Sequence, residues 1–304
     1  MNKAKLKVLY IAGFERSGST ILNRVLGQID GFIAWGELRD IWQHGIAENR
    51  RCTCENLFAD CPAWQEILKT AFDDFKKLNI TEITRLQKNT RSLVLPHYFG
   101  WLKDEVFKSK TGSYLNILEL LYQAIQIETN GKVIIDSTKA SWYGYVLNLL
   151  PAVDLYVVHI IRNPQGICYS LERRKQSGEL ECQWYNPVHA SLSWMAKNYS
   201  VEMLLNRDKT RYLRIRYEDF MNNPTDTVKL ILNLIQEADS QLPFKDSSTV
   251  KMGLDHLFTG SPSSRATVGS VKLKLDEKWK TRLKLLDKTT ISSLTLPLSK
   301  RYGY

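Results

Sequence analysis

The sequence lacks any long apolar run, any internal repeat and any dense block of charge of one sign. A membrane-spanning helix needs about 18 consecutive apolar residues, and no segment approaches that length. The apolar run at residues 8–14 passes into a glycine-rich segment without a small-residue cleavage site. We therefore expect neither a membrane span nor a signal peptide, and the absence of a short period excludes collagen-like and coiled-coil chains.

Cysteine is scarce, with five residues in 304. In a chain without an expected secretion signal, reduced thiols in the cytoplasm are the default. Cys52, Cys54 and Cys61 lie close together in sequence, and His44 could supply a fourth zinc ligand. Their spacing does not match a pair-plus-pair zinc site. We interpret this loop as structural, with zinc and a disulfide as less favoured alternatives.

Basic residues exceed acidic residues by 42 to 32, which gives a formal net charge of +10. The basic residues are dispersed, whereas a nucleic-acid binder usually concentrates them in a stripe or tail. We therefore expect a pocket for a small polyanion and no nucleic-acid partner. With 43% hydrophobic residues, the chain can bury a large core, which excludes intrinsic disorder.

Strand and helix patterns alternate along the chain, and the strands are short and continuously apolar. Such strands are typical of a parallel sheet covered on both faces. We expect one α/β domain over residues 1–304, a P-loop-like, doubly wound parallel sheet flanked by helices that binds its ligand at the carboxyl ends of the strands.

Residues 63–128 look helical and are interpreted as an insertion or lid, residues 37–43 look helical, and residues 240–270 look like loop. The expected strands are 7–12, 132–135, 155–161 and 212–215, and the expected helices outside the insertion are 19–27, 142–150, 164–175, 188–206, 225–237 and 276–286.

The segment from Gly13 to Thr20 lies between the first strand and the first helix and nearly matches the phosphate-binding pattern G-x-x-x-x-G-K-[ST]. Backbone N–H groups at such a helix start bind anions, with the helix dipole behind them. Ser19 stands where a nucleoside triphosphatase has lysine, and Arg16 supplies the positive charge. The loop therefore predicts an anion site and disfavours ordinary ATP or GTP hydrolysis; a tight structural turn is the alternative.

A second anion site is predicted where the strand at 155–161 ends at Arg162. Asn163 is a good N-cap and Pro164 suits the first helical position, so a helix should begin at once. Ser170 and Arg174 then lie four residues apart on one helix face. Guanidinium groups and a hydroxyl can clamp a phosphate; a solvated surface helix is the alternative.

These two segments resemble the motifs of sulfotransferases that use 3′-phosphoadenosine 5′-phosphosulfate (PAPS). Residues 14–20 look like the 5′-phosphosulfate motif, and the block from Arg162 to Ser170 looks like the 3′-phosphate motif. The resemblance covers most of the chain in the right order and is closest to the bacterial branch and the tyrosylprotein type, which carry R-S-G-[ST]-T. It implies PAPS as co-substrate, held by Arg16, Ser17, Gly18, Ser19, Thr20, Arg162, Ser170, Arg174, Tyr217 and Arg265.

The resemblance also implies catalytic roles. In the tyrosylprotein-like branch a glutamate shortly after the first helix is the general base, and Glu37 would have that role here. The alternative is a carboxylate that only stabilises the start of a helix. Arg16 and Lys139 would stabilise charge on the sulfuryl and bridging oxygens. We expect no metal requirement, because arginine and lysine already neutralise the leaving phosphate. Asp136, read as a magnesium ligand, would instead suit a phosphotransferase.

The expected function is transfer of a sulfuryl group from PAPS to a hydroxyl or amine of a small molecule. A secondary metabolite is the acceptor class that we favour; a saxitoxin-type alkaloid is one example, although no residue identifies it. One rival is a P-loop kinase or NTPase that uses ATP–Mg²⁺. The other is a non-catalytic polyanion binder, whose affinity would follow salt concentration steeply.

Overall fold

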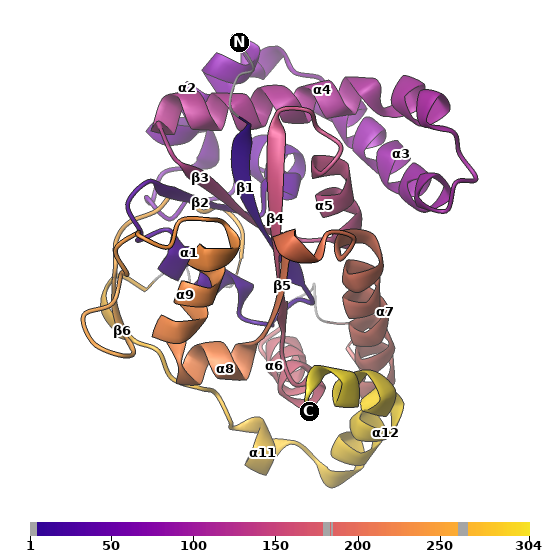
Figure 1. Ribbon diagram of the computed structural model, residues 1–304, viewed down its shortest axis with the longest axis vertical. Helices are drawn as coiled ribbons and strands as arrows, with labels where there is room; N and C mark the ends of the chain where they lie inside the picture. Colours follow the sequence, from indigo (N-terminus) through magenta and orange to yellow (C-terminus); the bar gives the residue numbers. More distant parts are fainter. Residues whose placement is uncertain (1–4, 179–182, 184, 261–266) are drawn as a thin grey trace.

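A parallel sheet of five strands forms the centre of the computed structural model, which describes residues 5–178, 183, 185–260 and 267–304 (Figure 1). The strand order is β2-β3-β1-β4-β5, and every neighbouring pair is parallel. The strands are β1 Leu6–Gly13, β2 Phe32–Gly36, β3 Val133–Lys139, β4 Val153–Ile161 and β5 Tyr212–Arg216. The predicted α/β fold with a parallel sheet is confirmed.

Helices cover both faces of this sheet, and alternate residues of β1 face the two helical layers. Val8 and Tyr10 pack in the core with α4, α5 and α7, whereas Leu9 and Ile11 pack in the core with α1, α8 and α9. This burial on both sides explains why β1 reads as a continuous apolar run. The helices of the two layers are α4 Asp104–Thr129, α5 Ser141–Leu147 and α7 Pro187–Leu205, and α1 Ser19–Leu26, α8 Tyr217–Asn222 and α9 Pro224–Leu234.

The remaining helices extend these layers at the two ends of the sheet (Figure 1). At one end, α2 and α3 pack against α4; at the other, α6 and α12 pack against α7. Within the described residues, no helix is long and apolar enough to cross a membrane. The bounds are α2 Pro62–Phe72, α3 Ile80–Tyr98, α6 Pro164–Gln176, α11 Trp279–Arg282 and α12 Leu285–Tyr302, with the short 3₁₀ helices η1 Leu38–Asp40, η3 Phe58–Asp60, η4 Phe75–Lys77 and η6 Lys209–Arg211 and the π-helix η2 Ile41–Ala47.

Several predicted elements were wrong. The edge strand β2 was missed. The helical segment expected at residues 37–43 is present as the 3₁₀ helix η1 followed by the π-helix η2. The region 240–270, expected as loop, holds a two-stranded antiparallel sheet of β6 Thr249–Met252 and β7 Gly269–Lys272. The helix expected at 276–286 is interrupted, because Leu283 and Lys284 are extended, and the final helix is α12.

The topology places the expected ligand-binding position at the middle of the sheet. After β1 the chain forms the edge strand β2 and then β3, which lies between β2 and β1, and it then crosses to β4 and β5 on the other side. The strand order therefore reverses at the carboxyl end of β1, where doubly wound sheets bind ligands. The glycine-rich loop begins at this point.

Candidate active site

The two glycines of the loop are required by its close contacts. Gly13 has φ +149°, and a Cβ there would lie 2.4 Å from the carbonyl oxygen of Ile160. Gly18 caps α1 with φ +91°, and a Cβ there would lie 2.4 Å from the ring of Tyr217. Because only glycine fits both positions, the loop can pass close beneath β4 and Tyr217.

The hydroxyl residues of this loop surround the start of α1. Ser17 is fully buried, and its hydroxyl has no hydrogen-bond partner among the described residues. A buried polar atom of this kind needs an explanation, and a bound anion supplies one. Ser19 is buried at the first position of α1, and Thr20 is half-buried beside it. These features fit the anion site that the sequence predicts.

The two arginine motifs meet in space. The Nε of Arg16 donates to the hydroxyl of Ser170 at 2.9 Å, and Nη1 of Arg162 donates to the carbonyl of Arg16 at 3.1 Å. The guanidinium of Arg162, which is buried, lies 4.5 Å from the centre of the Tyr217 ring. Four of the predicted nucleotide-binding residues therefore form one group.

The helix after Arg162 begins as predicted. Asn163 caps α6 by accepting a hydrogen bond from the backbone of Gln165 at 2.9 Å, and Pro164 occupies the first turn. Ser170 and Arg174 lie one turn apart on this helix, and Arg174 is half-buried. The cap fixes where α6 starts, so Ser170 comes to face Arg16.

The predicted general base and the predicted lysine form an ion pair. Glu37 directly follows β2, and Lys139 ends β3, the neighbouring strand. Lys139 Nζ contacts Glu37 Oε1, and both side chains are mostly buried. The backbone N–H of Glu37 donates to Thr259 Oγ1 at 3.3 Å. The strand ends thus bring together the two catalytic candidates that the sequence separates by 102 positions (139 − 37).

Asp136, the candidate magnesium ligand, is enclosed by protein. It is fully buried, Tyr122 donates to its Oδ2 at 2.5 Å, and the backbone of Thr138 donates to its Oδ1 at 2.8 Å. Burial raises the pKa of Asp136 to about 6, against the opposing effect of these hydrogen bonds. Both carboxylate oxygens are already used, which disfavours the phosphotransferase alternative.

A buried arginine that the sequence analysis missed holds the C-terminal segment against α1. Arg24 Nε donates to Asp255 Oδ2 at 2.5 Å, and its two other nitrogens donate to the carbonyls of Gly253 at 3.0 Å and Thr267 at 2.6 Å. Gly260 in the same segment lies beside Thr20. Arg265, predicted to bind the nucleotide, lies outside the described residues. A charged residue on an otherwise apolar stretch of α1 was the available signal for Arg24.

The cysteine-rich loop also meets this C-terminal segment. Cys52, Cys54 and Cys61 lie around His256. His44, the fourth ligand considered from sequence, instead pairs with Glu48 at 2.9 Å. The His44 alternative was therefore wrong, because the histidine beside the cysteines comes from far along the chain.

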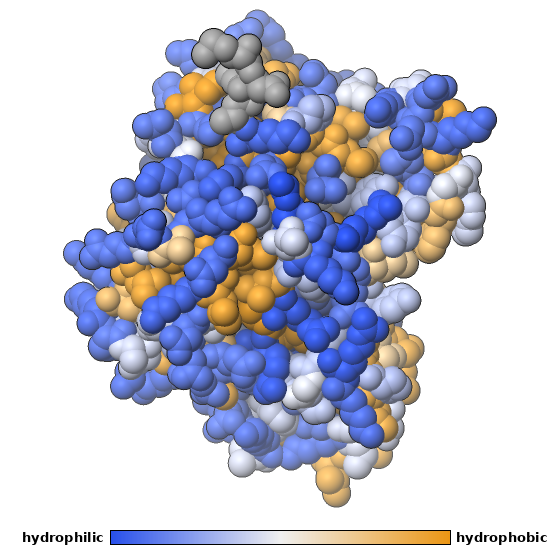
Figure 2. Space-filling model, viewed as in Figure 1, coloured by the Kyte–Doolittle hydropathy of each residue, from blue (hydrophilic) through white to orange (hydrophobic). Residues whose placement is uncertain are grey.

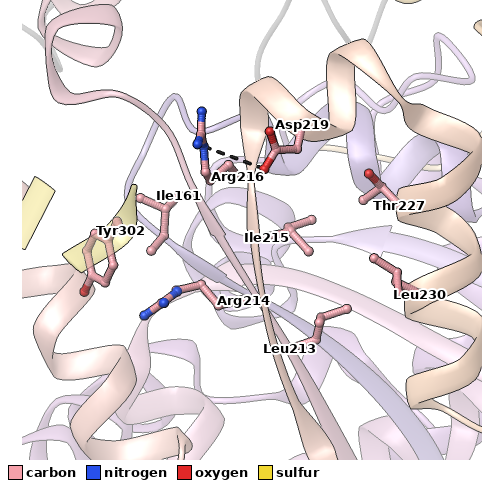
Figure 3. A pocket seen from close by; sticks show the side chains of 9 residues that line it. All are labelled: Ile161, Leu213, Arg214, Ile215, Arg216, Asp219, Thr227, Leu230 and Tyr302. Carbon is pink, nitrogen blue, oxygen red and sulfur yellow. Dashed lines mark ion pairs between the residues drawn. The ribbon is translucent and has the colours of Figure 1, made fainter. Parts of the chain in front are cut away.

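A cavity of about 260 Å³ lies beside the edge strand β5, away from these residues (Figure 3). Figure 2 shows an apolar area in the middle of this face, where α9 and β5 lie side by side. Arg216 and Asp219, 3.7 Å apart, form an ion pair at its edge. No described candidate residue lines this cavity, although Ile161 and Arg216 in its lining directly precede Arg162 and Tyr217. It is lined by Ile161, Leu213, Arg214, Ile215, Arg216, Asp219, Thr227, Leu230 and Tyr302.

Comparison with solved structures agrees with this fold. The sulfotransferase domain from the Synechococcus PCC 7002 olefin synthase matches 100% of this chain and 97% of its own, at 18% identity and a TM-score of 0.51. The sulfotransferase domain from the curacin biosynthetic pathway matches 98% of this chain and 99% of its own, at 17% identity and a TM-score of 0.52. A search of curated proteins found no match.

The sequence pattern of the Sulfotransferase family matches residues 9–240. This span begins in β1 and includes the glycine loop, both catalytic candidates and α6. It covers well over half of the chain, so the protein belongs to the Sulfotransferase family and is a sulfotransferase enzyme.

Proposed function

We propose that the enzyme transfers the sulfuryl group of PAPS to a hydroxyl or amine of a small molecule. The observation that carries this proposal is the hydrogen bond from Arg16 to Ser170, together with that from Arg162 to Arg16. These bonds join the loop expected at the 5′-phosphosulfate to the helix expected at the 3′-phosphate. One ligand with phosphate groups at both ends fits such a junction better than a simple triphosphate does.

The residues present fit this co-substrate. The buried hydroxyl of Ser17 lacks a partner among the described residues, and Gly18 lets the loop lie directly against the ring of Tyr217. Arg162 lies against the ring of Tyr217, where base or ribose could pack beside a bound phosphate. The N–H groups at the start of α1 would hold the 5′ end, and Arg162, Ser170 and Arg174 would hold the 3′ end.

When bound, PAPS supplies the sulfuryl group and leaves as adenosine 3′,5′-bisphosphate. Glu37 accepts the proton from the acceptor's hydroxyl or amine at a carboxylate oxygen. Arg16 and Lys139 provide fixed positive charge where negative charge develops. The ion pair of Lys139 with Glu37 keeps base and cation adjacent. These residues require no metal for the transfer step in this proposal.

The acceptor would approach from the side of Glu37. Helix α3 reaches this side, because Gln87 donates to the carbonyl of Arg39 at 3.2 Å. We therefore propose that the helical region 63–128 shapes the acceptor site. Asp40 is paired with Arg39 and Glu15 with Lys197, so acidic groups alone do not select a cation. An acceptor screen should include neutral secondary metabolites as well as cationic alkaloids of the saxitoxin type.

The test is calorimetric titration with adenosine 3′,5′-bisphosphate, beside ATP with Mg²⁺. We expect metal-independent binding of the bisphosphate that is lost in Arg162→Ala. The matched control is Arg173→Ala, an exposed arginine on α6 that should bind as the wild type does. Circular dichroism would verify that both variants fold.

Binding of ATP–Mg²⁺ alone would overturn the proposal and favour the kinase alternative. Binding that weakens steeply with salt, and is the same with or without the 3′-phosphate, would favour a polyanion binder. If the bisphosphate binds as expected, transfer of label from radioactive PAPS to a panel of acceptors would identify the acceptor.

A further inference from the structure

Three cysteines and one histidine meet at a place that the proposed reaction does not use. Cys52, Cys54 and Cys61 come from the loop before α2, and His256 comes from the segment after β6. Their three sulfur atoms and one imidazole nitrogen all lie within 4.8 Å of one another. Cys52 and Cys61 are buried, and Cys54 and His256 are half-buried. The segments are about 200 residues apart in sequence, so sequence spacing cannot reveal the group.

Three of the distances between these atoms are close to those of a tetrahedral metal centre, and all of them are within 4.8 Å. Cys54 Sγ and Cys61 Sγ are 3.5 Å apart, Cys61 Sγ and His256 Nδ1 are 3.2 Å apart, and Cys52 Sγ and His256 Nδ1 are 4.0 Å apart. Zinc binds thiolate at about 2.3 Å and imidazole at about 2.0–2.1 Å, so tetrahedral ligand atoms lie about 3.5–3.8 Å from each other. The observed separations bracket that range. A disulfide instead requires its sulfur atoms at about 2.05 Å.

The two segments are also joined by hydrogen bonds that hold the ligands in place. The backbone of Thr53 donates to the carbonyl of Leu257 at 2.8 Å, and the backbone of Leu257 donates to Thr53 Oγ1 at 2.9 Å. The indole of Trp64 donates to the carbonyl of His256 at 2.9 Å. Thr53 lies between two of the cysteines and Leu257 directly follows His256, so these bonds fix the two segments against each other at the group.

We propose that Cys52, Cys54, Cys61 and His256 bind one Zn²⁺ ion as a closed structural site. Four protein ligands leave no open position for a substrate, which separates this role from catalysis. Binding requires thiolates and a neutral imidazole, so the thiol protons are released to solvent and no electron is transferred. The combination of three thiolates and one imidazole is a common donor set for structural zinc.

The ion would fasten the C-terminal segment to the loop before α2. Three residues after His256, Thr259 accepts the hydrogen bond from the backbone of Glu37, and Gly260 lies beside Thr20. The zinc would therefore fix the segment that closes over the start of α1. This site would stabilise the arrangement around the nucleotide without touching it.

The first test is the metal content of the purified full-length protein, measured by inductively coupled plasma mass spectrometry. We expect one zinc per chain in the wild type, and loss of zinc in Cys54→Ser and Cys61→Ser. The controls Cys168→Ser, a buried cysteine in another part of the core, and His44→Ala should keep it. Wild-type stoichiometry needs no variant, so the test stands even if a cysteine variant fails to fold.

A second readout distinguishes metal from oxidation. Exchange with Co²⁺ should give thiolate-to-metal charge-transfer bands and the intense visible bands of a tetrahedral centre. A zinc-free protein with a disulfide among these cysteines, found by peptide mass spectrometry, would overturn the proposal, as would a zinc-free protein with reduced thiols. A zinc-free wild type that still transferred sulfuryl groups would overturn this inference and leave the proposed function intact.

Discussion

Glu37 is positioned by residues that surround it on three sides. Lys139 pairs with its carboxylate, Thr259 binds its backbone, and Gly36 precedes it with φ +78°. We expect Glu37→Gln to lower kcat about 10²–10⁴-fold, because an amide cannot take the proton from the hydroxyl or amine that attacks the sulfuryl group. Affinity for adenosine 3′,5′-bisphosphate should stay within about twofold, since Glu37 acts on the acceptor side.

The control for this experiment is Asp226→Asn, which removes an exposed carboxylate on α9 paired with Lys229. It should leave kcat nearly unchanged. Steady-state kinetics with calorimetric titration checks both variants, and equal losses of turnover and nucleotide affinity in Glu37→Gln would contradict the base assignment.

Two buried titratable residues give opposite dependences of stability on pH. Burial lowers the pKa of His159 from 6.5 to about 4, while its ring nitrogens contact Tyr212 and Asn198. The unfolded chain therefore takes up this proton first as pH falls, and stability falls between pH 6.5 and 4 by up to about 3 kcal/mol. Burial raises the pKa of Asp136 from 3.8 to about 6, so acidification over that range stabilises the folded chain.

These two effects partly cancel in the wild type below pH 6. We expect Asp136→Asn to remove the stabilisation on acidification that Asp136 provides. The destabilisation on acidification that His159 causes would remain. Urea unfolding from pH 7 to pH 4.5 should then show a steeper loss of unfolding free energy on acidification in Asp136→Asn than in the wild type. Equal slopes would mean that the pKa of Asp136 is not raised in the folded chain.

At the scale of elements, the sequence predicted what local patterns determine. The apolar run of β1, the glycines after it and the Asn163–Pro164 start of α6 are all local signals, and each was confirmed. The strand β2 was missed because FIAWG is short and lies at the sheet edge, where its pairing with β3 decides its conformation. The interruption at Leu283 has no strong breaker residue to reveal it.

The turn from β1 into α1 depends on Gly18. We expect Gly18→Ala to destabilise the protein by about 1 kcal/mol through its positive φ, and by a further ~1–3 kcal/mol through the contact with Tyr217. Gly100→Ala is the matched control, since Gly100 has φ +75° and open space around it. Urea unfolding measures both, and bisphosphate affinity should fall only in Gly18→Ala. Equal destabilisation by the two variants would show that the contact with Tyr217 is unimportant.

At the scale of the whole molecule, the site is assembled from distant parts of the chain. The motifs around Arg16 and Arg162 could be predicted, because each contains its own anion-binding signal. The attachment to α1 of the segment from Gly253 to Gly260 could not, because it depends on which acceptors the fold brings to the buried side chain of Arg24. The meeting of His256 with three cysteines is likewise a product of the fold.

Arg24 should control how firmly this segment is held. Arg24→Lys keeps the charge but loses the planar fork that reaches Asp255, Gly253 and Thr267 together. We expect faster amide hydrogen exchange in residues 253–257, with unchanged protection in β1 and β4. Arg214→Lys, which alters an ion pair of a more exposed arginine with Glu202, is the control and should change neither region. Unchanged exchange in Arg24→Lys would show that other contacts hold the segment.

Two buried indoles lie where these distant parts join. Trp35, at the end of β2, and Trp64, in α2, have ring centres 4.4 Å apart and planes inclined at 58°. Chromophores so close and so tilted couple their electronic transitions and produce paired bands of opposite sign in circular dichroism. Because Trp64 also donates to the carbonyl of His256, we expect detachment of the C-terminal segment to change this exciton signal. The molecule thus contains an optical reporter of its own assembly, which Trp64→Phe would silence.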